Sequence, residues 1–209
     1  MIQNIIFDLG VVLLEVDYEK TIQAFRQLGL ENPLEAFSKY KQDDLFKRLE
    51  IGGISDRDFL SELSFRMNGI EPVRIEKAWC AMLGQLPKRK FQLLKQLKSR
   101  YRLFILSNTN SLHQRKFEEI IDEAFGWKHF ESCFEYIGYS HQIGQRKPDR
   151  QSFEYLLDQF ALKPEETLFI DDTEGHVQAA NNLGIVGKHY EEGEDLGIIL
   201  AQNPGPISF

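Results

Sequence analysis

Short runs of apolar residues recur along this chain, each bounded by polar residues or turn formers. Continuous apolar runs of this length are typical of strands that are buried on both faces of a parallel sheet. Strands are therefore predicted at Ile2–Phe7, Leu103–Leu106 and Leu168–Ile170, with weaker candidates at Tyr136–Tyr139 and Ile185–Tyr190.

Amphipathic segments with helical spacing alternate with these runs, at Lys90–Arg100, Gln151–Phe160 and Val177–Leu183. Gly184 follows the last of them, where a C-terminal cap is expected, and Pro148 suits a first helical turn. Strands that alternate with helices favour an α/β fold with a doubly wound, Rossmann-like parallel sheet.

One long segment interrupts this alternation with helical patterns alone. These patterns cover Tyr18–Leu28, Pro33–Glu50, Ser55–Met67 and Pro72–Met82, and glycines separate them. Ser55 is expected to cap its helix. We therefore predict a Rossmann-like core of residues 1–14 and 85–209 that carries an inserted all-helical cap of residues 15–84.

Composition describes an ordinary globular protein of 209 residues, 42% hydrophobic, with a net charge of −7. This charge argues against a nucleic-acid partner, which requires clustered positive charge. The chain lacks a basic signal segment and any apolar run long enough to span a membrane, so a cytoplasmic protein is expected. Cys80 and Cys133 are expected to be free buried thiols. The sequence gives no indication of oligomeric state.

Polar residues that follow the predicted strands carry the candidate chemistry. Asp8 ends the first apolar run, and open α/β sheets bind ligands at the carboxyl ends of their strands. Three later segments lie where they can complete a site around Asp8: Leu106-Ser107-Asn108-Thr109, Arg146-Lys147-Pro148-Asp149 and Phe169-Ile170-Asp171-Asp172. Together they suggest metal-assisted phosphoryl transfer.

The chain resembles the haloacid dehalogenase superfamily of hydrolases in these four segments, in order and at plausible spacing. Phe7-Asp8-Leu9-Gly10-Val11-Val12 is similar to the first signature, and the other three segments are similar to the second, third and fourth. Glu50-Ile51-Gly52-Gly53-Ile54-Ser55 also resembles the helical cap of the branch that includes bacterial sugar-phosphate phosphatases.

The resemblance implies a role for each candidate residue. Asp8 would attack phosphorus and form an aspartyl-phosphate, while Ser107 and the backbone N–H of Asn108 would hold phosphoryl oxygens. Lys147 would neutralise charge. Mg²⁺ would be bound by Asp8, Asp172, the Gly10 carbonyl and, through a water, Asp171. Each segment also has a purely structural interpretation: a solvated acidic turn, a capping serine, or a lysine in a solvated loop.

Gly10 departs from the family pattern, in which most phosphatases have a second Asp that protonates the leaving oxygen. Such a general acid typically accelerates the reaction by about 10²–10⁴-fold. Three explanations stay open. The leaving group needs little help, as in an α-glucose-1-phosphate phosphatase of the same branch; another group delivers the proton; or catalysis is degraded and the protein only binds phosphorylated ligands. The candidate proton donors are Glu15, Asp17, His113 and His176, and a structural interpretation is open for each.

These observations predict a Mg²⁺-dependent phosphatase that hydrolyses a small phosphorylated metabolite, with a sugar phosphate favoured. A hydrolytic 2-haloacid dehalogenase shares the fold and the attacking Asp, but it needs no metal, so the pair Asp171-Asp172 argues against it. A non-enzymatic protein that binds a phosphate ligand is the alternative of a different class. The sequence does not identify the phosphomonoester.

Overall fold

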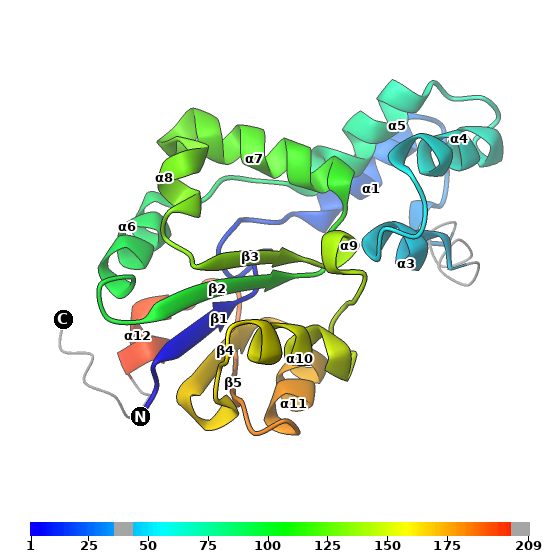
Figure 1. Ribbon diagram of the computed structural model, residues 1–209. Coiled ribbons are helices and arrows are strands. Elements are labelled where there is room, and N and C mark those ends of the chain that lie inside the picture. Colours follow the sequence, from blue (N-terminus) through cyan, green and yellow to red (C-terminus); the bar gives the residue numbers. More distant parts are fainter. Residues whose placement is uncertain (36–43, 202–209) are drawn as a thin grey trace.

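The computed structural model describes residues 1–35 and 44–201 of the chain. At its centre is a parallel sheet with the strand order β3-β2-β1-β4-β5 (Figure 1). The strands are β1 (Asn4–Phe7), β2 (Arg102–Ser107), β3 (Tyr136–Tyr139), β4 (Thr167–Asp171) and β5 (Val186–His189). The predicted doubly wound α/β fold is confirmed, and each predicted strand is present with ends shifted by at most two residues.

Strand register brings the predicted signatures to one edge of the sheet. Phe7 at the end of β1 lies opposite Ile105 of β2 on one side and Ile170 of β4 on the other. The residues that follow these positions therefore emerge side by side, although they are distant in the sequence.

Helices cover both faces of the sheet, and successive side chains of β1 point to opposite faces. Ile5 and Phe7 pack with one set of helices, and Ile6 packs with the other. The first set contains α6 (Lys88–Leu97), α7 (Ser111–Phe125), α8 (Trp127–Glu131) and α12 (Leu196–Ala201). The second set contains α10 (Arg150–Gln159) and α11 (Glu174–Asn181).

A separate helical unit lies beyond the carboxyl ends of the strands (Figure 1). It contains α1 (Tyr18–Gln27), α3 (Leu45–Glu50), α4 (Asp56–Arg66), α5 (Pro72–Trp79) and the short 3₁₀ helix η1 (Cys80–Met82). These helices share a hydrophobic cluster that includes Phe25, Phe59 and Leu63, and Leu112 of α7 also belongs to it. The boundaries predicted for a core and a cap stay a prediction.

The two connections between the helical unit and the sheet run antiparallel and are hydrogen-bonded to each other. Glu15 N donates to Gln85 O at 3.0 Å, Gly84 N donates to Glu15 O at 2.8 Å, and Asp17 N donates to Met82 O at 2.8 Å. These bonds fix the point at which the chain leaves the sheet and returns to it.

Local signals for helix ends agree with the structure in most places. Ser55 caps α4 by accepting a hydrogen bond from Asp58 N at 3.1 Å, and Gly184 after α11 has a φ of +82°. Pro148 is an exception: it lies before α10, which begins at Arg150, and the Lys147–Pro148 peptide bond is cis.

Other segments extend or limit the sequence predictions. Within the predicted helix Pro33–Glu50, α3 begins only at Leu45, and residues 36–43 lie outside the described residues. Helices that the apolar pattern did not delimit are α7, α8, α12, the short α9 (Ser140–Ile143) and the 3₁₀ helix η2 (Pro164–Glu166).

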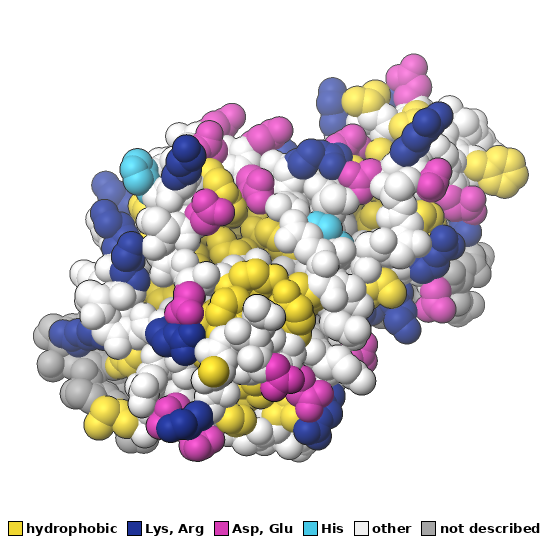
Figure 2. All heavy atoms as spheres, in the orientation of Figure 1, with side chains coloured by type: hydrophobic (Ala, Val, Ile, Leu, Met, Phe, Trp, Pro, Cys, Tyr) yellow, Lys and Arg dark blue, Asp and Glu magenta, His cyan; other side chains and the backbone are white. Residues whose placement is uncertain are grey.

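The surface carries charges of both signs, and the thiols match the expectation of free buried cysteines. On the face shown in Figure 2, Lys and Arg side chains are interspersed with Asp and Glu. Cys80 and Cys133 are buried and free. Within residues 1–35 and 44–201, no helix has both the length and the apolar character that crossing a membrane requires.

Candidate active site

A cavity of about 160 Å³ lies at the carboxyl ends of β1, β2 and β4. All but one of the predicted site residues line it: Asp8, Gly10, Ser107, Asn108, Lys147 and Asp172. The exception is Asp171, which is fully buried directly beside it. The structure therefore brings the four predicted segments together.

Lys147 joins two of these segments by paired charges. Its Nζ lies 2.6 Å from Asp8 Oδ1 and 2.6 Å from Asp171 Oδ2, and its side chain is only 1% exposed. Burial acts to lower the pKa of Lys147, but the two carboxylates outweigh burial and raise it above its usual range. The ammonium group is therefore charged and fixed between β1 and β4.

Both carboxylate oxygens of Asp171 have partners within the protein. Besides the Lys147 contact through Oδ2, its Oδ1 accepts a hydrogen bond from Thr173 N at 2.8 Å and lies 3.0 Å from His176 Nδ1. Burial acts to raise the pKa of Asp171, but Lys147 and His176 hold it at about 2. These contacts suit a carboxylate that positions Lys147.

The cavity carries excess negative charge. Burial raises the pKa of Asp8 although Lys147 opposes this, and burial with the nearby Asp171 raises the pKa of Asp172. When ionised, the three carboxylates and the single ammonium of Lys147 sum to −3 + 1 = −2. This imbalance matches the charge of one divalent cation.

The donor set is compatible with Mg²⁺, which prefers oxygen ligands and commonly takes one or two carboxylates while keeping waters. Asp8, Asp172 and the Gly10 carbonyl face the same cavity. Within the described residues, no group of three or more His, Cys, Asp or Glu side chains is arranged to hold a metal ion. Asp171 lies buried beside these groups, and its contact with the metal through a water stays a prediction.

Two reciprocal hydrogen-bond pairs fix the loops around the cavity. Asn108 Nδ2 donates to Lys147 O at 2.8 Å, and Lys147 N donates to Asn108 Oδ1 at 2.8 Å. Ser140 Oγ donates to Thr109 O and accepts from Thr109 N, both at 2.9 Å. Sequence analysis missed Ser140, because no motif accompanies it and its role depends on a contact across 31 positions.

Gly10 stands where the family pattern has an acid, and a side chain there would contact its neighbours. A Cβ atom at this position would lie 3.4 Å from Val16 Cγ2 and 3.9 Å from Asp8 Oδ2. A side chain at position 10 is therefore close to ordinary packing distance and would begin beside the nucleophile candidate.

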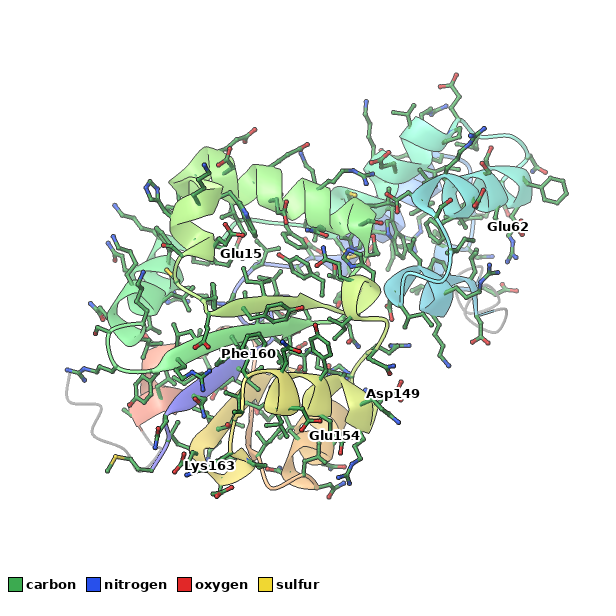
Figure 3. The ribbon with its side chains drawn as sticks, in the orientation of Figure 1. Glu15, Glu62, Asp149, Glu154, Phe160 and Lys163 are labelled. Carbon is green, nitrogen blue, oxygen red and sulfur yellow. The ribbon has the colours of Figure 1, made fainter. Side chains whose placement is uncertain are left out.

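The candidate proton donors divide into two groups. His113 and His176 line the cavity, whereas Glu15 and Asp17 are not part of its lining. Figure 3 labels Glu15, which belongs to the connection described above. Asp17 caps α1 by accepting from Glu19 N at 3.1 Å.

His113 has a structural environment. Its ring stacks on Trp79 at 5.1 Å, and its Nε2 lies 3.0 Å from Trp79 O. Burial lowers the pKa of His113 to about 4. His113 is therefore neutral near pH 7, and its Nε2–H is engaged by a backbone carbonyl.

Comparison with known proteins places this site in a family. The family model for haloacid dehalogenase-like hydrolases matches residues 2–184. The chain belongs to this family. The predicted superfamily, and with it the prediction that the chain is an enzyme, is confirmed.

Several members of this family are similar to the chain over nearly its full length. A D-ribitol-5-phosphate phosphatase from Bacteroides thetaiotaomicron is 30% identical over 200 residues, which cover 93% of this chain and 95% of that protein. A haloacid dehalogenase family enzyme from the same organism, solved as a magnesium complex, is 31% identical with a TM-score of 0.86 and covers 95% of this chain and 98% of its own. A wild-type structure of that enzyme with magnesium and inorganic phosphate has a TM-score of 0.85 at 29% identity, covering 95% of this chain and 99% of its own.

Similarity to a haloacid dehalogenase from Xanthobacter autotrophicus is weaker. That structure is 18% identical, with a TM-score of 0.58, and covers 88% of this chain and 76% of its own. At this level of identity the likeness shows the fold alone.

Proposed function

We propose that the chain is a Mg²⁺-dependent phosphatase that hydrolyses a small phosphomonoester through an aspartyl-phosphate on Asp8. The observation that carries this proposal is the position of Lys147 Nζ, 2.6 Å from Asp8 Oδ1 at the base of the cavity. The relative that is named a D-ribitol-5-phosphate phosphatase supports the same reaction class, as does the magnesium and phosphate complex of a similar enzyme.

The proposed reaction has two displacements at phosphorus. An Asp8 carboxylate oxygen forms a bond to phosphorus while the ester P–O bond breaks, and the departing alkoxide takes up a proton from a water molecule. The hydroxide that remains then attacks the phosphorus of the aspartyl-phosphate, which breaks its bond to Asp8, releases inorganic phosphate and restores the Asp8 carboxylate.

Residues around Asp8 would stabilise charge during both steps. Lys147 contributes a fixed positive charge in a buried setting, where electrostatic stabilisation is strong. The Ser107 hydroxyl and the Asn108 backbone N–H are proposed to bind phosphoryl oxygens, while the Asn108 side chain anchors Lys147. Asp171 is proposed to position Lys147.

A bound Mg²⁺ would neutralise the charge between the anionic nucleophile and the anionic phosphoryl group. Asp8, Asp172 and the Gly10 carbonyl are proposed as its protein ligands. We also propose that residues 15–84 act as a cap that excludes bulk water from the site.

Hydrolysis of p-nitrophenyl phosphate with Mg²⁺ and with EDTA tests this function. Turnover is expected with Mg²⁺ and should be lost with EDTA and in Asp8→Asn. Release of halide from a 2-haloacid, unaffected by EDTA, would instead identify a dehalogenase. Phosphate binding by a folded protein that turns over none of these substrates would identify a binding protein.

A further inference from the structure

A second cavity, of about 470 Å³, adjoins the first under the helical unit. The two cavities share Tyr18 and Met82 in their linings. The second cavity therefore lies next to the cavity that Asp8 lines, with these two side chains at the boundary. The volume of this second cavity is in the range of small-molecule sites.

Apolar side chains from several parts of the helical unit dominate the lining of the second cavity. They are Tyr18, Ile22, Leu34, Phe46, Trp79 and Met82. Tyr18 and Leu34 are each 62% exposed, which is unusual for large hydrophobic residues in this chain. Exposed apolar side chains that gather at one cavity commonly mark a binding surface.

The polar residues of the lining are Thr21, Lys47, Glu50 and Arg146. Thr21 Oγ1 donates to Trp79 O at 3.3 Å and accepts from Met82 N at 3.0 Å. Arg146 Nε lies 3.1 Å from Glu50 Oε2, an ion pair that links the third signature to α3. These four residues are a minority of the lining, so a hydroxyl group placed against its apolar part finds no partner there, which costs affinity.

We propose that the substrate's leaving group is predominantly apolar and lies in this second cavity. The inference rests on the proposed phosphatase function and names the substrate class for it. It differs from the expectation of a sugar phosphate, because sugar hydroxyls need hydrogen-bond partners, whereas most side chains of the described lining are apolar.

A series of n-alkyl phosphates from ethyl to hexyl tests this inference. Their leaving groups are primary alkanols of similar basicity, so differences in kcat/KM report how well the protein binds the alkyl chain. Each buried methylene is worth about 0.8 kcal/mol, which corresponds to roughly fourfold. We expect kcat/KM to rise by about that factor per methylene until the cavity is filled. A constant or falling kcat/KM along the series would overturn the inference.

Pentyl phosphate and D-ribitol 5-phosphate form a matched pair, because they have the same five-carbon chain without and with hydroxyl groups. The inference predicts a higher kcat/KM for pentyl phosphate. Preference for the polyol would overturn it while leaving the phosphatase function intact.

Variants locate the effect in the second cavity. Ile22→Ser and Leu34→Ser should reduce the gain per methylene to less than about twofold. Phe65→Ser is the matched control, because Phe65 is 83% exposed on α4 and does not line this cavity. An equal loss in all three variants would contradict the assignment. Absence of turnover with every ester, p-nitrophenyl phosphate included, would instead overturn the proposed function itself.

Discussion

At the scale of single residues, Lys147 illustrates how burial gives a charged group its function. A lysine that is almost fully buried needs compensating charge, and Asp8 and Asp171 supply it at 2.6 Å each. Because Asp171 is itself fixed by Thr173 and His176, the ammonium group has little freedom to move. A rigid cation beside the nucleophile needs no reorganisation when charge develops on the phosphoryl group.

Gly10 leads to a prediction about leaving groups. Introducing Gly10→Asp places a carboxyl group beside Asp8 with room for its Cβ. If the group supplies a proton, turnover of alkyl phosphates should rise on the order of 10²-fold, and p-nitrophenyl phosphate should gain far less because nitrophenolate leaves without protonation. Steady-state kinetics on both substrates measure the difference.

Gly10→Asn is the control for this prediction, because it has nearly the same size but cannot transfer a proton. We expect it to leave the ratio between the two substrates unchanged. An equal gain on both substrates in Gly10→Asp would show that position 10 does not act on the leaving group.

His113 gives a prediction about stability and pH. Burial lowers its pKa from 6.5 to about 4 in the folded state, so between these values the unfolded chain binds more protons. This contribution to stability is complete above pH 6.5 and is lost as the pH falls towards 4. The loss amounts to roughly 3 kcal/mol. Urea unfolding of the wild type and His113→Gln across this pH range measures it.

The difference between the two His113 unfolding curves removes the contributions of other titrating groups. We expect the free energy of unfolding of the wild type to fall more steeply with decreasing pH than that of His113→Gln. Parallel curves would show that His113 takes up its proton at an ordinary pH in the folded state.

At the scale of elements, the pattern of hydrophobic residues best predicted the strands that are buried on both faces of the sheet. All four residues of β1 are buried, and its apolar run predicted the strand directly. The same pattern did not delimit α7, although α7 is 15 residues long, because its apolar positions are spread among charged ones. The sequence also predicted that Asp8, Ser107 and Asp172 lie close together, because the carboxyl ends of parallel strands meet at one edge of the sheet.

Sequence analysis could not predict the side-chain contacts between elements. The burial of Asp171 could not be predicted, because an adjacent pair of acids does not show which member is buried. Ser140 was missed for a related reason: its side chain acts on the backbone of Thr109, and nothing near position 140 indicates that partner.

Ser140→Ala tests the importance of this link between the start of α9 and the second-signature loop. The substitution leaves the N–H and C=O groups of Thr109 buried without their partner, which should cost about 1–3 kcal/mol of stability. It should also weaken phosphate binding, because the loop carries Ser107 and Asn108. Urea unfolding and inhibition by inorganic phosphate measure the two effects.

Ser132→Ala is a matched control, because Ser132 Oγ makes an exposed bond to His129 O at 2.9 Å. Its free energy of unfolding should stay within about 0.5 kcal/mol of the wild type. Equal stability and equal phosphate inhibition in Ser140→Ala and Ser132→Ala would show that the Ser140 link does not support the site.

At the scale of the whole molecule, the overall charge of −7 and the charge of the cavity have the same sign. The protein therefore offers no general attraction for a phosphate ester, and attraction has to arise within the site. A cation that neutralises the excess of −2 in the cavity would serve both binding and stability, because it relieves repulsion among buried carboxylates.

Magnesium is accordingly expected to stabilise the folded protein. A ligand that binds only the native state at a hundred times its Kd contributes about 2.7 kcal/mol, which for a chain of this size raises Tm by roughly 5–11 °C. Thermal unfolding with Mg²⁺, with EDTA and with K⁺ at equal ionic strength measures the shift. Asp172→Asn should abolish most of it, because that substitution removes one of two carboxylate ligands.

Asp149→Asn is the control that separates a local site from general screening of negative charge. Asp149 belongs to the third signature and stands at the start of α10 (Figure 3), yet it is exposed and does not line the cavity. The Asp149→Asn variant should keep the full rise in Tm with Mg²⁺, since the Asp149 carboxylate is not one of the proposed metal ligands. A shift reduced equally in Asp149→Asn and Asp172→Asn would mean that Mg²⁺ acts on the overall charge of the protein and that Asp8 and Asp172 do not form its site.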